Sequence, residues 1–403
     1  MNKKLCLVAT APALMYLFNR SLIPALLADG WEITGVTSAG QPGFGEDDYY
    51  AKLQRLGVKM VAIPISRDPR LFRDLWCFFR LWIFFLRNRF DVVHASHPKA
   101  VLLAPLAAFF ACHPNRVITI RGRVYENAVG WKRRIFAALD RLSCFLCRRV
   151  IVVSHSLREA MLKDNIGTPQ TLTVIGNGGS QGCDAAFFDR NLVPEENVKK
   201  LRRQCGLSEH DRVILFAGRQ RKDKGIVELV QAFVNISSDF ESNNSDHSDN
   251  PRNNEQWRLA LVGHEESASD VGETTRETIR NHPHIHTLDW LSDLRTAYKM
   301  ADIFVLPTWR EGFPNTVLEA SAMRLPVVTT TAIGAVDSVI DGKTGFLAPI
   351  NNAEQLAEKI RLLINSPTLR DEMGNAGRNR VLQDFSPKII RRKILELYGT
   401  MTK

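Results

Sequence analysis

The 403-residue sequence contains no apolar run of roughly 18 residues, the length that a membrane-spanning helix requires. Its opening apolar run, residues 5–10, is also too short to be the core of a secretory signal peptide. We therefore expect a protein that does not span a membrane. A chain of this length exceeds what one hydrophobic core usually organises, so we also expect two domains.

Cysteine is scarce, and its seven copies follow no disulfide-framework spacing. An odd, scattered set is typical of a reducing compartment, which we take to be the cytoplasm. Cys144 and Cys147 lie close together, but neither a second pair nor nearby histidines accompany them to complete a zinc site. We expect both to be core residues and predict no metal site.

Acidic residues are under-represented in the first half of the chain only. Residues 1–200 hold 27 Lys and Arg against 16 Asp and Glu, whereas residues 201–403 hold 26 against 27. The net charge of +10 therefore comes from the first half. This asymmetry predicts a polyanionic partner for one domain. The partner can be a nucleic acid, an anionic membrane surface or a phosphorylated substrate.

Short β-branched runs alternate with helical patterns along the chain, which is typical of parallel sheets covered by helices on both faces. We predict the α/β class, with two tandem doubly wound, Rossmann-like domains. The predicted strands are residues 4–10, 31–38, 58–65, 91–96, 116–122, 148–155 and 171–177 in the first half, and 211–219, 257–263, 285–290, 301–307 and 325–330 in the second.

The break between the domains is placed in the polar segment 185–210, which gives domains at residues 1–190 and 210–385. Residues 237–256 carry almost no apolar side chains, so we predict a flexible surface loop there. The tail, residues 386–403, has a proline early in a helical pattern, which favours a final helix.

Two carboxylates, Glu311 and Glu319, flank a turn-like stretch that joins a predicted strand, ending at Pro307, to a predicted helix. Ligands of open parallel sheets bind just beyond such strand ends. Asn315 or Thr316 can cap the helix, leaving backbone N–H groups that attract a phosphate. Glu319, expected in the first turn, then suits hydrogen bonds from ribose hydroxyls, and Glu311 faces another part of the ligand. The alternative is a capping role for Glu319 and a solvated Glu311.

A second cluster follows the predicted strand 211–219, which runs into Arg219 and then Lys224 and Gly225. Cations behind a glycine-bounded strand end can offset the charge of a diphosphate. Taken alone, the cluster can also be an exposed basic turn. Taken together, the two clusters predict a ligand with a diphosphate between two polyhydroxylated rings, and a nucleotide sugar is such a ligand.

The motifs G-R-(x4)-K-G at 218–225 and E-G-F-P-N-T-(x2)-E at 311–319 resemble the donor site of the family 4 retaining glycosyltransferases. The resemblance covers nearly the whole chain. It implies the GT-B fold, in which two Rossmann-like domains face a central cleft and the last helix crosses back to the first domain. It also implies a UDP-sugar as co-substrate, with no metal and no other cofactor.

The resemblance assigns roles to individual residues. Arg219 and Lys224 hold the donor diphosphate in that family, Glu311 contacts the donor sugar, and the second glutamate contacts the ribose. The catalytic set implied here is Arg219, Lys224 and Glu311. The donor-binding set implied here is Gly218, Arg219, Lys224, Glu311, Gly312, Phe313, Pro314, Asn315, Thr316 and Glu319.

Three further residues are implied to lie at the acceptor site. Arg121 stands where many family members have a histidine before a glycine, and a cation there can stabilise negative charge near the acceptor. His97 and Lys99 belong to a stretch that resembles members acting on polyprenyl-diphosphate-linked sugars, where either can meet the acceptor phosphate. An ordinary strand end followed by a helix is the alternative. The loop after the first strand also departs from the family, because it lacks the usual glycines.

Residues 67–90 form a helical pattern that is rich in aromatic residues and framed by six arginines. Such a helix suits the interface of an anionic membrane, and packing between the sheet and a neighbouring helix is the alternative. A second basic and aromatic stretch, residues 131–149, lies in the same domain, which we therefore expect to dock on a membrane. The side chains predicted to contact the membrane are Arg73, Trp76, Phe79 and Trp82.

The sequence thus predicts a retaining glycosyltransferase that moves a hexose or N-acetylhexosamine from a UDP-sugar to a polyprenyl-diphosphate-linked sugar. The expected product is an α linkage in a bacterial O-antigen, capsule or exopolysaccharide. We expect the enzyme to be cytoplasmic and peripheral on the inner face of the plasma membrane, without a nucleic-acid partner. Two alternatives stay open, a UDP-sugar 2-epimerase of the same architecture and a non-catalytic polyanion-binding protein.

Overall fold

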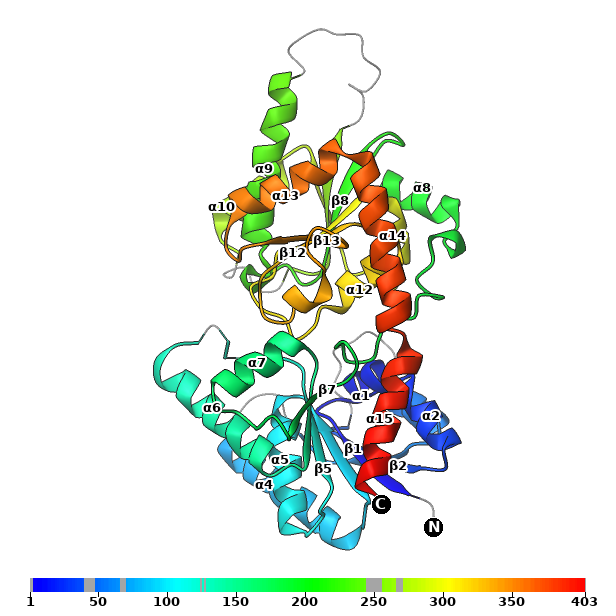
Figure 1. Cartoon of the computed structure of the whole chain (residues 1–403), viewed down its shortest axis with the longest axis vertical. Helices are drawn as coiled ribbons and strands as arrows, with labels where there is room; N and C mark the ends of the chain where they lie inside the picture. Colours follow the sequence, from blue (N-terminus) through cyan, green and yellow to red (C-terminus); the bar gives the residue numbers. More distant parts are fainter. Residues whose placement is uncertain are drawn as a thin grey trace. The chain divides into compact units, whose positions relative to one another are not determined.

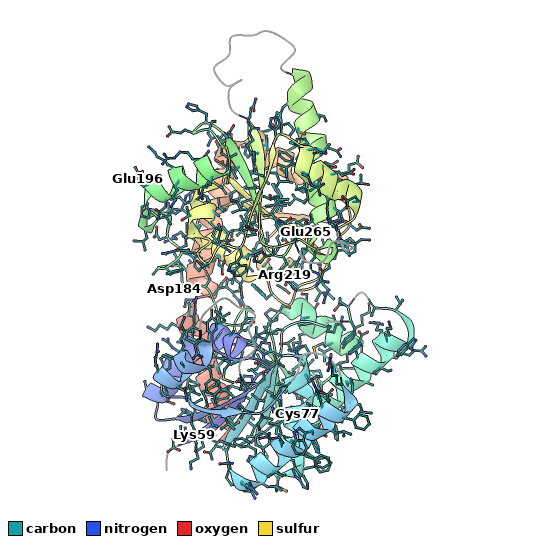
Figure 2. All side chains as sticks on the ribbon, turned by 180° about the vertical axis from the view of Figure 1, so that it is seen from behind. Lys59, Cys77, Asp184, Glu196, Arg219 and Glu265 are labelled. Atoms are coloured by element: carbon teal, nitrogen blue, oxygen red, sulfur yellow. The ribbon has the colours of Figure 1, made fainter. Side chains whose placement is uncertain are left out.

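The computed structural model describes residues 3–39, 48–65, 70–123, 125–126, 128–243, 256–265 and 271–402. The chain forms two compact units, which Figure 1 shows as ribbons and Figure 2 with side chains. Unit 1 comprises Met1–Gly182 together with Pro387–Lys403, and unit 2 comprises Cys183–Ser386. Among the described residues, no helix is both long enough and apolar enough to cross a membrane.

Unit 1 is built on a seven-stranded parallel sheet in the order β3-β2-β1-β4-β5-β6-β7. Its strands fall within the seven runs predicted from the sequence, so that prediction is confirmed. They are β1 (Lys4–Val8), β2 (Glu32–Thr37), β3 (Lys59–Ala62), β4 (Val92–Ser96), β5 (Arg116–Ile120), β6 (Arg149–Val152) and β7 (Leu172–Val174). The helices are α1 (Pro12–Asn19), α2 (Leu22–Ala28), α3 (Tyr49–Arg55), α4 (Leu71–Arg87), α5 (Pro98–Phe110), α6 (Gly130–Phe145), α7 (His155–Lys163) and α15 (Pro387–Met401).

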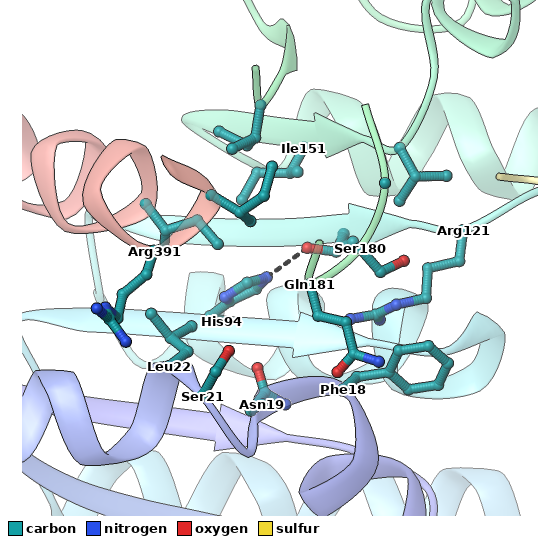
Figure 3. A pocket seen from close by; sticks show the side chains of 16 residues that line it. Phe18, Asn19, Ser21, Leu22, His94, Arg121, Ile151, Ser180, Gln181 and Arg391 are labelled. Carbon is teal, nitrogen blue, oxygen red and sulfur yellow. Dashed lines mark hydrogen bonds between the residues drawn. The ribbon is translucent and has the colours of Figure 1, made fainter. Parts of the chain in front are cut away.

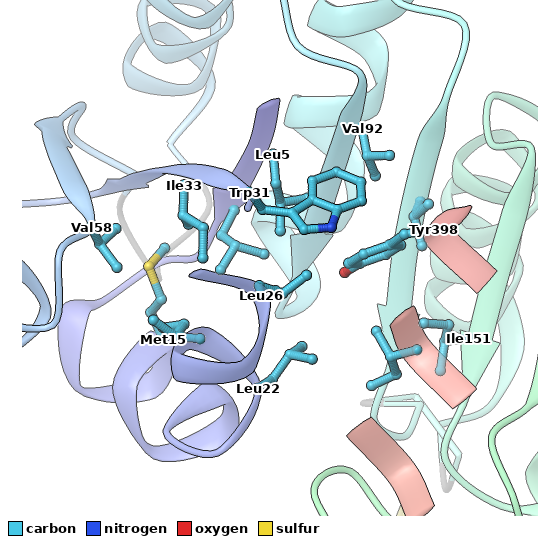
Figure 4. Close-up of a cluster of buried hydrophobic side chains, with 14 of the residues drawn as sticks. Leu5, Met15, Leu22, Leu26, Trp31, Ile33, Val58, Val92, Ile151 and Tyr398 are labelled. Carbon is cyan, nitrogen blue, oxygen red and sulfur yellow. The ribbon is translucent and has the colours of Figure 1, made fainter. Parts of the chain in front are cut away.

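Helices cover both faces of this sheet (Figure 1). Helices α4, α5 and α6 lie side by side on one face, while α1, α2 and α15 pack on the other. The core of the second face joins strand residues such as Leu5 to residues of α15 (Figure 4). Tyr398 of α15 is fully buried, and its ring lies 5.7 Å from that of Trp31. The C-terminal helix is therefore part of the core of unit 1.

Unit 2 contains a six-stranded parallel sheet in the order β10-β9-β8-β11-β12-β13. The two doubly wound sheets confirm the predicted fold class. The strands are β8 (Arg212–Ala217), β9 (Trp257–Val262), β10 (Ile285–Leu288), β11 (Ile303–Leu306), β12 (Val327–Thr330) and β13 (Gly345–Ala348). The helices are η1 (Arg190–Leu192), α8 (Glu195–Gln204), η2 (Lys222–Lys224), α9 (Ile226–Asn243), α10 (Glu273–Asn281), α11 (Arg295–Met300), α12 (Asn315–Ala322), η4 (Val336–Ser338), α13 (Ala353–Asn365) and α14 (Pro367–Asp384).

The division between the units falls after Gly182, whereas the sequence placed the end of the first domain at residue 190. Side-chain bonds explain the difference. Asp189 accepts a hydrogen bond from Arg378 at 2.7 Å, and Arg190 donates to the carbonyl oxygen of Lys299 at 3.0 Å. Both partners lie in unit 2, so these bonds join the residues around 190 to that unit.

The predicted loop at 237–256 begins later than expected, because residues 237–243 continue α9. Arg361 of α13 pairs with Asp239 at 2.7 Å and so anchors this polar end of the helix. Residues 244–255 of the predicted loop lie outside the described residues. The sequence analysis did not predict β13, because its residues, Gly-Phe-Leu-Ala, include no β-branched side chain.

All seven cysteines lie within the described residues, where none forms a disulfide. Cys144 and Cys147 are buried, as predicted for core residues. Burial raises the pKa of both thiols, so they stay protonated and apolar in character.

Candidate active site

The predicted donor residues gather where the winding of the unit 2 sheet reverses. Strands β8 and β11 are neighbours, but the chain leaving β8 leads to β9 on one side and the chain leaving β11 leads to β12 on the other. Open parallel sheets bind ligands at such switch points, beyond the carboxyl ends of the strands. Residues 218–225 follow β8 and residues 307–314 follow β11, so the two sequence motifs meet at this edge.

Gly225 brings these two loops into direct contact. The short helix η2 ends at Gly225, whose φ of 73° is left-handed. A Cβ there would lie 2.0 Å from the carbonyl oxygen of Pro307, so a glycine is required. As a result, Nζ of Lys224 pairs with Oε1 of Glu311. Only 15% of the Lys224 side chain and 22% of the Glu311 side chain are exposed, which shields the pair partly from water.

Asp223 ties the same two loops together. Its carboxylate accepts a hydrogen bond from Arg310 at 2.9 Å, and its carbonyl oxygen accepts one from the backbone N–H of Trp309 at 2.9 Å. Burial tends to raise the pKa of Asp223, but Arg310 and Lys224 outweigh it and hold that pKa below its ordinary value. The loop after β8 is therefore joined to the loop after β11 by ionised groups.

Gly334 supports the Glu311–Gly312 backbone from a third segment. It has a φ of 80°, and a Cβ on it would lie 2.3 Å from the carbonyl oxygen of Gly312. The backbone N–H of Glu311 also donates to the carbonyl oxygen of Ile333 at 3.2 Å. Sequence reasoning missed this support, because no local pattern links residue 334 to the glutamate.

Helix α12 starts at the edge where these loops meet. Its N-cap is Pro314, which makes no side-chain capping bond in the described structure. The prediction that Asn315 or Thr316 caps the helix is therefore wrong, since both residues lie inside it. Proline has no side-chain acceptor, so it leaves the N–H groups of the first turn uncapped by its side chain.

Glu319 lies in the second turn of α12, so its predicted place in the first turn is also wrong. Its Oε2 accepts a hydrogen bond at 2.9 Å from the hydroxyl of Tyr298, which is fully buried. Burial and the nearby Glu319 raise the pKa of Tyr298 well above its ordinary value, so the hydroxyl keeps its proton. A carboxylate has about four acceptor positions, so this bond orients Glu319 and still permits bonds from a ligand.

The other predicted donor residues differ in exposure. Arg219 is exposed next to the end of β8 (Figure 2), and Gly218 precedes it. Phe313 is buried, with its ring 5.4 Å from that of Phe385. The phenylalanine of the motif thus anchors the loop in the core of unit 2.

In unit 1 the sheet reverses between β1 and β4, and two of the predicted acceptor residues meet there around Phe18 of α1. The Phe18 ring lies 5.7 Å from the ring of His97 and 4.3 Å from the guanidinium carbon of Arg121. His97 has a φ of 81°, which is rare for a residue other than glycine and is common at functional positions. Sequence reasoning missed Phe18, because an aromatic residue in a helix usually indicates core packing.

Lys99 has a different environment. Its Nζ pairs with Asp74 of α4 at 2.8 Å, and only 12% of its side chain is exposed. The lysine therefore links α5 to the helix predicted to contact a membrane.

His94 lies buried beneath this group. Its Nδ1 contacts the hydroxyl of Tyr398, and its Nε2 lies 2.7 Å from Oγ1 of Thr119, the bond that is dashed in Figure 3. Burial, with a further contribution from Arg121, lowers the pKa of His94 to about 3. The neutral imidazole therefore connects the unit 1 sheet to α15.

The predicted membrane helix, α4, buries one face and exposes the rest. Cys77, Leu81 and Phe85 are buried, whereas Arg73, Trp76 and Phe79 are exposed. Trp82 is only half-buried, and its indole nitrogen is enclosed by protein. The Trp82 ring lies 6.3 Å from that of Phe79, and its contact with a membrane stays a prediction.

Among the described residues, no group of three or more His, Cys, Asp or Glu side chains is arranged to hold a metal ion.

Comparison with known proteins gives matches over both units. Residues 18–178 match the family described as Glycosyltransferase Family 4, and residues 197–380 match the family described as Glycosyl transferases group 1. The capsular polysaccharide biosynthesis glycosyltransferase CapM of Staphylococcus aureus is 32% identical over 345 residues, which is 85% of each chain. A Campylobacter jejuni enzyme, N,N'-diacetylbacillosaminyl-diphospho-undecaprenol alpha-1,3-N-acetylgalactosaminyltransferase, is 25% identical and covers 89% of this chain and 90% of its own.

Solved structures share the fold. A glycosyltransferase of Rickettsia africae superposes with a TM-score of 0.78 at 20% identity, covering 100% of this chain and 99% of its own. The Anabaena protein HepE gives a TM-score of 0.76 at 18% identity, covering 99% and 100%. The fold and the site define a glycosyltransferase with the GT-B architecture. The chain belongs to family 4 of the glycosyltransferases.

Proposed function

We propose that the enzyme transfers a hexose or N-acetylhexosamine from a UDP-sugar to a sugar carried on a polyprenyl diphosphate, during assembly of a bacterial surface polysaccharide. Two relatives support this choice. CapM acts in capsular polysaccharide biosynthesis, and the name of the Campylobacter enzyme gives a diphospho-undecaprenol sugar as its acceptor. HepE, which shares the fold, was solved in complex with UDP and glucose.

The observation that carries the donor part of this proposal is the ion pair between Lys224 and Glu311 at the switch point. A bound diphosphate competes for Lys224, because it offers the ammonium a doubly charged partner. Glu311 then turns to the hydroxyls of the donor sugar. Glu319, oriented by Tyr298, accepts hydrogen bonds from the ribose.

Departure of UDP leaves negative charge on its β-phosphate. Lys224, Arg219 and the N–H groups at the start of α12 are proposed to stabilise that charge, with no metal ion. We assign no covalent nucleophile. The acceptor hydroxyl attacks C1 of the donor sugar from the face that the diphosphate leaves, the bond from C1 to the diphosphate oxygen breaks, and the hydroxyl proton passes to the departing UDP. The anomeric configuration is thus retained, and an α-linked UDP-sugar gives an α linkage.

Unit 1 is proposed to bind the lipid-linked acceptor at an anionic membrane on the cytoplasmic side. It holds 29 Lys and Arg against 13 Asp and Glu, a net charge of +16, whereas unit 2 holds 24 against 30. The layer of α4, α5 and α6 also exposes large apolar side chains beside these cations. Those on which the proposal rests are Phe72, Trp76, Phe79, Phe110, Trp131 and Phe145. Aromatic residues next to cations suit an anionic headgroup region.

Transfer assays with purified protein in detergent test this proposal. UDP-hexoses and UDP-N-acetylhexosamines are supplied with and without synthetic polyprenyl-diphosphate sugars, and the product linkage is read by NMR. We expect transfer that depends on the lipid-linked acceptor and yields an α linkage. Epimerisation of the nucleotide sugar without acceptor would instead identify a 2-epimerase, and UDP-sugar binding without turnover would identify a non-catalytic binder.

A further inference from the structure

Arg121 is half-buried, and the described residues provide no acidic side chain that pairs with its guanidinium. Its Nε and Nη1 atoms are enclosed by protein, and neither has a hydrogen-bond partner among the described residues. Burial lowers the pKa of Arg121 to about 10, so the guanidinium is still charged at neutral pH. A buried charge without a partner is costly, and each such group in a native protein requires an explanation.

Arg123, two residues further on, is an arginine with a structural role in the same unit. Its guanidinium is also buried, but it pairs with Asp164 at 2.6 Å and with Glu126 at 2.7 Å. Among the described residues, the guanidinium of Arg121 lies 4.3 Å from the Phe18 ring and pairs with no Asp or Glu. A structural role therefore does not account for Arg121 as it does for its neighbour.

Arg121 lines a recess at the carboxyl edge of the unit 1 sheet (Figure 3). Among the described residues that line this recess there is no Asp or Glu, whereas Arg391 adds a second cation. His94 is neutral, so it adds no charge of its own. The recess is therefore electropositive, with its charge fixed by arginine.

Gln181 adds a third polar atom without a partner among the described residues. Its Oε1 is buried and accepts no hydrogen bond from the described residues. Figure 3 shows its side chain, like those of Arg121 and Phe18, lining the recess. The recess thus offers donors to an oxyanion and, next to them, an acceptor for a hydroxyl.

The recess opens to solvent and has a volume of about 20 Å³, which is room for about one water molecule at its base. A whole sugar does not fit inside, but one oxygen of a carboxylate or phosphoryl group does. The ring that carries this group would then rest at the mouth of the recess.

We propose that this recess is an oxyanion subsite, in which Arg121 binds the carboxylate or phosphoryl group of a substrate sugar and Gln181 accepts a hydrogen bond from a hydroxyl of the same sugar. The inference rests on the proposed function, since it adds a substrate class to the acceptor side of that site. The sugar handled by unit 1 is accordingly acidic, either as a uronate or as a glycosyl phosphate. A neutral sugar gains nothing from the guanidinium.

Ligand-observed NMR on the full chain tests this subsite with three probes: glucuronate, glucose 1-phosphate and methyl glucoside. We expect at least one anionic probe to bind the wild type, and methyl glucoside to bind at least tenfold more weakly. The stronger of the two anionic probes identifies the source of the oxyanion. Arg121→Gln should weaken the anionic probes by about 10- to 100-fold, the effect of losing charged hydrogen bonds.

Arg392→Gln is the matched control, because it removes an exposed arginine of α15 without touching the recess. Binding of the anionic probes should be unchanged in this variant. Arg121→Gln should also keep or raise the melting temperature of the unliganded protein, because it removes a buried unpaired charge. A lower melting temperature, or equal binding of all three probes to wild type and Arg121→Gln, would overturn the inference.

UDP binding is measured in the same samples. Wild-type protein that binds UDP but does not prefer either anionic sugar refutes the oxyanion subsite and leaves the proposed donor function standing. Protein that does not bind UDP refutes the proposed function itself.

Discussion

At the scale of single residues, the proposed donor site depends on side chains that face each other at the ends of β8 and β11. The motif around Arg219 and the motif around Glu311 could be read from the sequence, because each follows a predicted strand. Their contact could not, since it depends on a glycine at 225 that allows the backbone to approach Pro307. The bond between Tyr298 and Glu319 could not be predicted either, because a tyrosine in a short helix usually indicates core packing.

Lys224→Ala should reduce turnover by about 100- to 1000-fold, the usual cost of losing a group that stabilises charge in the transition state. Its effect on stability should be smaller than that on turnover, about 1–2 kcal/mol, because Glu311 loses its partner in a partly shielded pair. Lys222→Ala is the matched control, since Lys222 lies in the same short helix and contacts the Trp309 ring. Steady-state kinetics measure the turnover of both variants, and thermal unfolding measures their stability. Equal turnover in the two would contradict the role of Lys224.

Glu319→Ala should weaken UDP binding by about 10- to 100-fold, because a charged acceptor of ribose hydroxyls is lost. Tyr298→Phe removes only the bond that orients this carboxylate, so a smaller loss of a few-fold is expected. Isothermal titration with UDP compares the two. If Tyr298→Phe loses as much affinity as Glu319→Ala, Glu319 acts through the structure and not through the ribose.

His94 should make the stability of unit 1 depend on pH. Its pKa is lower in the folded protein than in the unfolded chain, so the unfolded state binds the extra proton and acid destabilises the fold. This contribution is fully present above the unfolded pKa of about 6.5 and is lost progressively toward pH 3, by up to about 1.4 kcal/mol per pH unit. His94→Gln removes this dependence.

Urea unfolding of wild type and His94→Gln at about pH 7.5 and about pH 5 measures the effect, and the stability difference between the two proteins should shrink by about 2 kcal/mol at the lower pH. Titration of other groups cancels in this comparison. A difference that is the same at both pH values would mean that His94 is not buried in its neutral form.

At the scale of elements, strands were easier to predict than helix ends. Most strands of the two sheets are largely buried apolar runs, which are visible in the sequence, whereas β13 was not predicted. The start of α12 was misjudged by one or two residues, because Asn315 and Thr316 are good capping residues and Pro314 is not. Because of this small error, Glu319 was predicted in the first turn, whereas it lies in the second. The helix dipole is weaker there, so the bond to Tyr298 explains more of the orientation of Glu319 than the dipole does.

The sequence predicted a helix in the region of α4, and the exposed aromatic residues of α4 form the proposed membrane contact. Replacing Trp76 and Phe79 by serine should reduce binding to phosphatidylglycerol vesicles by at least about tenfold, since each inserted side chain contributes about 1.5–3 kcal/mol. Trp290→Ser is the matched control, because Trp290 in unit 2 is 63% exposed, close to the 61% of Trp76. Vesicle sedimentation gives the result, and unchanged binding of the α4 variant would assign this helix to ordinary packing.

At the scale of the whole molecule, the sequence predicted two doubly wound units and the segregation of positive charge into the first. The structure sharpens both points, because assigning α15 to unit 1 raises the charge of that unit to +16. Unit 2 is acidic, although its candidate site is rich in cations. The cations there are thus a local arrangement, whereas those of unit 1 are a property of the entire unit.

A crystal structure of the protein with UDP would show where the nucleotide binds. We expect the diphosphate within hydrogen-bonding distance of Lys224 and the first turn of α12, and the ribose in contact with Glu319. UDP bound at any other place, with the Lys224–Glu311 pair unchanged, would contradict the proposed donor site.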